Sequence, residues 1–162
     1  MVDVTTINPG TVFAWFMLGM LLRRGVLILL FNIGIRKHGF QPGTRVPEDN
    51  PNNRKKRRSE TDPQPIEYTL NMRANKVITN DAENDTYFLI LLLATAVFTD
   101  TLSGNATRTI VYGVIYLVIR IVYAFMYILE LQPWRTILFV MGIVCTVACN
   151  LDLVITMSRR SN

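Results

Sequence analysis

The chain has 162 residues, which suits a single domain, and we treat residues 1–162 as one unit. Half of the residues are hydrophobic and the mean hydropathy is +0.27, which is more apolar than soluble domains of this size usually are. Two cysteines and one histidine exclude a disulfide framework, and no zinc-ligand spacing is present. The net charge of +5 gathers in one loop between apolar segments, so we expect a membrane protein with no nucleic-acid partner.

The first apolar segment, about residues 11–35, is long enough to cross a bilayer but carries two arginines in its middle. A charged side chain there costs about 2.5–3.5 kcal/mol on insertion scales, so such residues usually face the bundle interior and find a partner. We expect one of Arg23 and Arg24 to point inward and the other to reach the headgroups or pair elsewhere. Asp152, near the end of the last apolar segment, is a candidate partner.

A long basic loop, residues 36–74, follows. Ten Lys/Arg stand against five Asp/Glu between Arg36 and Lys76, and the run Arg54–Arg58 supplies half of them. The positive-inside rule places this loop in the cytosol. The basic run suits anionic lipid headgroups and a solvated loop equally well.

The second segment, about residues 75–99, begins with an acidic cluster and becomes apolar only later. Its uninterrupted apolar run, Tyr87 to Phe98, has 12 residues, which is too short to span a bilayer. It crosses only if the polar turns before Tyr87 continue as helix against protein. The third and fourth segments, about 109–131 and 136–157, are long enough, so we expect four spans with both termini opposite the loop. Cys145 and Cys149 suit small buried packing positions in the fourth.

Two polar faces are expected at the same depth, because the second and third helices run in opposite directions. The faces consist of Lys76, Asn80 and Glu83 on the second helix and of Arg120, Tyr123 and Tyr127 on the third. Spacings of three and four residues place each set on one side of its helix. Each face descends about 10 Å from the cytosolic side at ~1.5 Å per residue. Arg135, in the turn that follows the third helix, lies at the mouth of this band.

Such a band could bind a molecule with two carboxylates and an amine. Lys76 and Arg120 suit the carboxylates and Glu83 suits the ammonium, while the asparagine and the tyrosines supply hydrogen bonds. The alternative is a structural network in which Glu83 and Arg120 neutralise each other and the tyrosines are packing or interface aromatics. The spacing alone leaves both interpretations open.

Two stretches resemble one known family. NDAENDTYFLI, residues 80–90, resembles the second-helix signature of the membrane-associated proteins in eicosanoid and glutathione metabolism (MAPEG), in the branch of microsomal glutathione transferase and microsomal prostaglandin E synthase. IRIVYAFMYILELQPWR, residues 119–135, resembles the third helix and following turn of that branch. Lys76 stands where the family has an arginine, and Ile78 where it usually has a histidine. Lysine keeps the charge but loses the two-pronged fork that binds a carboxylate.

The resemblance implies an all-α integral membrane four-helix bundle that assembles as a homotrimer, with glutathione as co-substrate bound between subunits. The implied glutathione ligands are Lys76, Asn80, Glu83, Arg120, Tyr123 and Tyr127, with Arg73, Asp81 and Thr136 as additional contacts. Arg135 is implied as the catalytic residue, and its alternative role is to anchor the helix end at the headgroups. The implied location is the endoplasmic reticulum, or also the mitochondrial outer membrane, with the site facing the cytosol.

The function that this resemblance implies is a membrane-bound glutathione S-transferase or peroxidase. It would activate glutathione as a thiolate for attack on lipophilic electrophiles or lipid hydroperoxides that arrive through the membrane. One alternative is a prostaglandin-type isomerase that returns glutathione unchanged, and another is a non-catalytic, lipid-presenting member of the family. Outside the family, an ion channel or transporter would use Arg23, Arg24 and Arg120 as pore charges.

Overall fold

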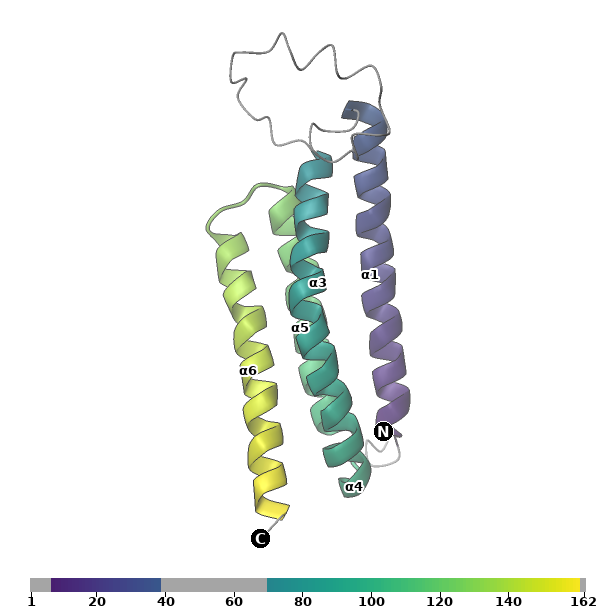
Figure 1. Cartoon of the computed structure of the whole chain (residues 1–162), viewed down its shortest axis with the longest axis vertical. Helices are drawn as coiled ribbons and strands as arrows, with labels where there is room; N and C mark the ends of the chain where they lie inside the picture. Colours follow the sequence, from purple (N-terminus) through teal and green to yellow (C-terminus); the bar gives the residue numbers. More distant parts are fainter. Residues whose placement is uncertain (1–6, 39–69, 161–162) are drawn as a thin grey trace, which may run out of the picture.

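The computed structural model describes residues 7–38 and 70–160, and every regular element in these two ranges is helical. The helices are α1 (Pro9–His38), α3 (Leu70–Ala94), α5 (Thr107–Ile128) and α6 (Trp134–Arg160). A π-helical turn, η3 (Thr95–Asp100), and a short α4 (Thr101–Ser103) continue α3 without a break. The helices lie roughly parallel to one long axis in an up-and-down bundle (Figure 1).

Four of the described helical stretches are long and apolar enough to cross a membrane, which confirms the expected number of spans. They are Pro9–Gly34, Met72–Ser103, Thr107–Ile128 and Trp134–Arg159. The second span runs on to Ser103, past the expected end at about 99, and the third ends at Ile128, before the expected end at about 131. α1 ends at His38 and α3 begins at Leu70, so the interval between these two helices is shorter than the loop predicted at 36–74. Its basic run, Arg54–Arg58, lies outside the described residues.

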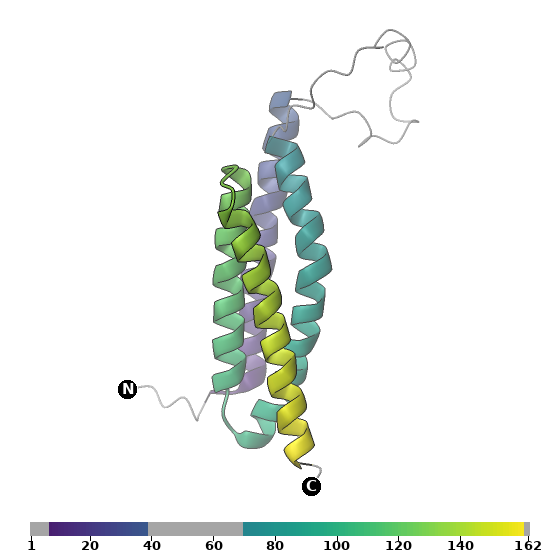
Figure 2. The ribbon, with the colours of Figure 1, turned by 90° about the vertical axis from the view of Figure 1, so that its left-hand side faces the viewer.

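Both ends of the described chain lie at the same end of the bundle, opposite the end where α1 finishes and α3 begins (Figures 1 and 2). This is the arrangement that four antiparallel spans require. α3 contacts all three of the other long helices, and α5 packs along both α1 and α6. α3 and α5 are therefore the two helices that each contact all of the others.

The polar turns of α3 do continue as helix, and one of their faces is covered by protein. Ala74, Val77, Asp81, Phe88 and Leu92 are buried, at spacings of three, four, seven and four residues. These spacings keep all five on one side of a helix with 3.6 residues per turn. The acidic cluster thus lies on a continuous helix, and α1 and α5 cover the side of it that carries Asp81 and Asp85.

The core consists of two apolar clusters with a charged layer between them. One cluster contains Phe16, Met20, Phe88, Leu92, Tyr116, Ile119, Cys145 and Cys149. The other contains Leu27, Val77, Tyr123 and Ala124. Along each of α1, α3 and α5, the charged residues of the interior stand between members of the two clusters in the sequence. Cys145 and Cys149 are free and buried, which confirms their expected packing role.

Candidate functional site

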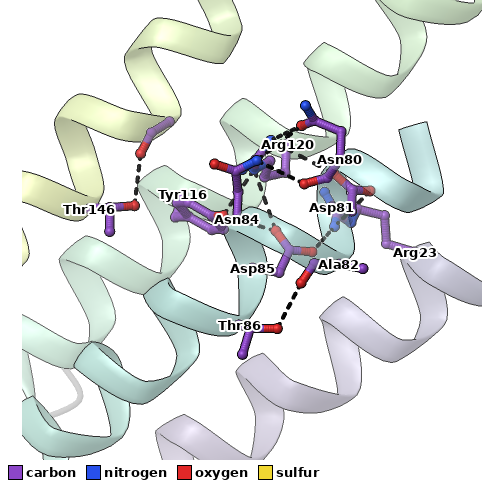
Figure 3. A network of polar contacts seen from close by, with 11 residues as sticks. Arg23, Asn80, Asp81, Ala82, Asn84, Asp85, Thr86, Tyr116, Arg120 and Thr146 are labelled. Atoms are coloured by element: carbon purple, nitrogen blue, oxygen red, sulfur yellow. Dashed lines mark hydrogen bonds and ion pairs between the residues drawn. The ribbon is translucent and has the colours of Figure 1, made fainter. Parts of the chain in front are cut away.

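The charged layer is a set of two arginines and two aspartates inside the bundle, which we call the buried charge cluster. Its members are Arg23 on α1, Asp81 and Asp85 on α3, and Arg120 on α5 (Figure 3). Arg120 is 1 % exposed and Asp81 3 % exposed, so water contributes little to their solvation. The two positive and two negative charges sum to zero. This balance permits four ionised side chains within a membrane span.

Arg23 joins α1 to α3 through both aspartates. Its Nη2 donates a hydrogen bond to Asp85 and lies 3.1 Å from Oδ2 of Asp81. Arg23 is buried and Arg24 is exposed, which confirms that one of the pair points inward. The expected partner was wrong: Asp152 pairs with Arg108 at 3.3 Å, because the end of α6 lies beside the start of α5.

Arg120 has four polar neighbours. Its Nε donates to the Tyr116 hydroxyl at 2.9 Å and lies 3.4 Å from Oδ1 of Asp85. Its Nη1 donates to Oδ1 of Asn80 at 3.2 Å and lies 3.8 Å from Oδ1 of Asp81. The Asn80–Arg120 contact confirms that the two predicted polar faces lie at one depth.

The alternative in which Glu83 and Arg120 neutralise each other is wrong within the chain. Glu83 is exposed, and the acids beside Arg120 are Asp81 and Asp85. Sequence reasoning missed Asp85 and gave Asp81 only a secondary role. The signal was present in the spacing: the two aspartates are four residues apart and so share one face of α3, and Glu83, two residues from each, lies about 160° around the helix from them.

An aromatic series leads from the buried charge cluster to the turn between α5 and α6. The Arg120 guanidinium lies 5.7 Å from the ring centroid of Tyr123, and the Tyr123 and Tyr127 rings are 5.8 Å apart. The Arg135 guanidinium lies over the Tyr127 ring at 4.6 Å, a cation–π contact. We call Asn80, Arg120, Tyr123, Tyr127 and Arg135 the contact series, because each member touches the next.

The same turn is tied to the start of α3. Arg73 donates a hydrogen bond to the Ile128 carbonyl at 3.1 Å and forms an ion pair with Glu130. Glu130 has a positive φ of 62°, where the chain leaves α5. Thr136 is exposed in the first turn of α6, next to the half-buried Arg135. The contacts of Arg73 hold the end of α5 and the turn after it beside the start of α3.

Lys76 and Glu83 do not join the contact series within one chain. Both are exposed on the outer face of α3, while Asn80, between them on the helix, is half-buried against Arg120. Two ionisable side chains on an outward face at membrane depth are costly unless something polar covers them. Among the described residues there is also no group of three or more side chains suited to a metal ion.

A comparison with known families gives one match: the model of the MAPEG family covers residues 12–154. The chain belongs to the MAPEG family. The matched range contains the second and third spans, most of the first and fourth, the buried charge cluster and the contact series. No curated protein and no solved structure matches the chain significantly. MAPEG membership covers glutathione transferases, related enzymes and non-catalytic members, so it sets the class of the protein but not its reaction.

Proposed function

We propose that this MAPEG protein is a membrane-bound glutathione S-transferase and peroxidase that acts on lipophilic electrophiles or lipid hydroperoxides. The observation that carries the proposal is the contact series from Asn80 to Arg135. It joins a hydrogen-bonding amide inside the bundle to a guanidinium at the helix end. The family resemblance implied four of its members as glutathione ligands and the fifth, Arg135, as the catalytic residue.

Glutathione has two carboxylates, one ammonium and one thiol, and the proposed ligands suit these groups. The amine of Lys76 is exposed and ready to pair with a carboxylate, and the exposed Glu83 suits the ammonium. Asn80 and the hydroxyls of Tyr123 and Tyr127 supply hydrogen bonds. Arg120 is already balanced by two aspartates, so its role is to donate hydrogen bonds rather than to supply net charge.

Arg135 would stabilise the sulfur in its anionic form. A thiol is a weak nucleophile and a thiolate a strong one, and a guanidinium nearby favours the thiolate without acting as a base. In a transfer step the thiol proton leaves to water, the sulfur forms a bond to the electrophilic carbon, and the leaving group departs with its electron pair. In a peroxidase cycle two glutathiones reduce one hydroperoxide to an alcohol and water and are oxidised to one disulfide.

The exposure of Lys76 and Glu83 supports a site that neighbouring copies complete. A face of α3 that carries both charges is costly against lipid and favourable against a polar surface of another copy. We therefore propose a homotrimer with glutathione between subunits, as the family resemblance implies. The mouth at the α5–α6 turn lies at the same end of the bundle as the end of α1 and the start of α3 (Figure 1). We propose that this end faces the cytosol from the endoplasmic reticulum membrane.

One observation favours a second candidate, a non-catalytic member that presents lipids. The charge of Arg120 is already compensated within the chain, and Lys76 lacks the fork of the arginine that the family carries at this position. Both features weaken the attraction for a glutathione carboxylate. A prostaglandin-type isomerase would use the same thiolate and differs only in returning glutathione unchanged.

The test is a turnover assay on purified protein in detergent, with glutathione and either a chromogenic aryl halide or a lipid hydroperoxide. We expect consumption of glutathione in both reactions and a loss of at least a hundredfold in Arg135→Ala, as for removal of one charge-stabilising donor. Arg159→Ala, which removes an exposed arginine from the other end of α6, is the matched control. Binding of glutathione without its consumption would favour the isomerase, and no binding would favour lipid presentation.

A further inference from the structure

Arg120 is held from one side by a pair of residues that the proposed mechanism does not use. The Tyr116 hydroxyl accepts a hydrogen bond from Nε of Arg120 and donates one to Oδ1 of Asp85, each at 2.9 Å. Oδ1 of Asp85 also lies 3.4 Å from the same Nε. The Nη1 group of Arg120 reaches in another direction, to Asn80 (Figure 3). One nitrogen of the guanidinium thus contacts the pair and another faces the proposed ligand set.

The pair itself has little freedom to move. The Tyr116 ring is fully buried and stacks on the Phe88 ring, with centroids 3.7 Å apart and planes 5° from parallel. Asp85 is fixed through its other oxygen, which accepts the hydrogen bond from Arg23. Helix α6 closes the opposite side, where a Cβ atom on Gly142 would lie 3.7 Å from Nε of Arg120. The guanidinium is therefore confined between a rigid pair and a helix backbone.

Neutralisation of charge explains the aspartates but not the tyrosine. The four charged side chains already balance, and a buried hydroxyl adds no charge to that sum. What the hydroxyl adds is direction, since hydrogen bonds to a charged donor weaken steeply when they bend. A binding arginine must be held close to its productive orientation by its neighbours.

We propose that Tyr116 and Asp85 are positioning residues that fix the Arg120 guanidinium toward Asn80 and so set the affinity for glutathione. This inference rests on the proposed function, because it assigns the pair a role in that same site. Neither residue of the pair is among the proposed glutathione ligands, and neither is the proposed thiolate-stabilising residue, Arg135. We therefore expect their effect to fall on binding and not on the chemical step. The prediction is a change in KM for glutathione at constant kcat.

The test uses Tyr116→Phe, which keeps the ring stacked on Phe88 and removes only the hydroxyl. We expect the glutathione Kd from equilibrium dialysis, and KM with it, to rise about tenfold, the usual effect of losing a hydrogen bond to a charged group, with kcat unchanged. Asp85→Asn, which keeps the shape of the side chain, is expected to act in the same direction. Tyr112→Phe, one turn earlier on α5, is the matched control and is expected to leave Kd unchanged.

A double-mutant cycle with Arg120→Lys shows whether the pair acts through Arg120. A lysine has no Nε–H at this position, so adding Tyr116→Phe to Arg120→Lys is expected to change Kd less than twofold. Full additivity, or an unchanged Kd in Tyr116→Phe, overturns the inference and leaves the proposed function standing. Absence of glutathione binding by the unmodified protein overturns both. If Asp85→Asn does not fold, the tyrosine arm of the cycle decides alone.

Discussion

Replacing Arg23 by methionine tests the buried charge cluster directly. The guanidinium of Arg23 neutralises one of two aspartates whose side chains are 3 % and 14 % exposed. Without it the cluster keeps Asp81, Asp85 and Arg120, two negative charges against one positive, so its net charge falls from zero to −1. Leaving one charge of a buried network without its partner costs about 3–5 kcal/mol. We expect a loss of at least ~3 kcal/mol in the free energy of unfolding.

The two cysteines provide the assay, because both are free and buried in the folded protein. A thiol-reactive fluorophore added during a denaturant or temperature series labels them only as the bundle opens. Arg24→Met is the matched control, since Arg24 is the exposed neighbour on the same helix, and it is expected to change stability by less than about 0.5 kcal/mol.

A second substitution tests whether charge balance governs the stability of the buried charge cluster. In Arg23→Met combined with Asp81→Leu, the remaining Arg120, Asp85 and Tyr116 form a neutral, hydrogen-bonded set. Removing both partners of a buried ion pair is close to neutral, so the double variant is expected to regain most of the stability lost in the single one. A double variant less stable than Arg23→Met would show that charge balance does not govern this layer.

Three further predictions follow from the fold. Asp100→Ala removes the buried acceptor of the Thr109 backbone N–H (2.9 Å) and hydroxyl (2.8 Å), and is expected to cost about 1–3 kcal/mol in the labelling assay, while Asp100→Asn loses less. Gly142→Ala is expected to be neutral or stabilising, because the new Cβ has ordinary contacts, whereas Gly142→Leu displaces Arg120 and weakens glutathione binding; equal effects would contradict this. Native mass spectrometry is expected to give a complex of three 18.5 kDa chains, and a monomer would remove the cover proposed for Glu83.

The number of spans and the depth of the polar faces could be predicted from the sequence, because they depend on segment length and helical period. The polar turns before Tyr87 were expected to need protein cover, and α1 and α5 supply it. The Asn80–Arg120 hydrogen bond follows from the same depth argument.

The partners of the buried arginines could not be predicted in the same way. Spacing fixes which residues share a face, but not which face of α3 turns toward the bundle. Glu83 and Asp85 are two residues apart and so lie on different sides of the helix; packing buries the side with Phe88 and Leu92, and Asp85 lies on that side. Asp152 does lie near the end of the last span, as expected. That end of α6 lies beside the start of α5, so Asp152 pairs with Arg108 and not with Arg23.

The central claim is that Arg135 holds the sulfur of glutathione as a thiolate at the end of the contact series. Ultraviolet difference absorbance of the protein titrated with glutathione near neutral pH measures that thiolate without any second substrate. We expect a saturable thiolate band for the unmodified protein, a weaker band for Arg135→Lys and none for Arg135→Ala. A band of full strength in Arg135→Ala, or glutathione that binds without any band, would contradict the account.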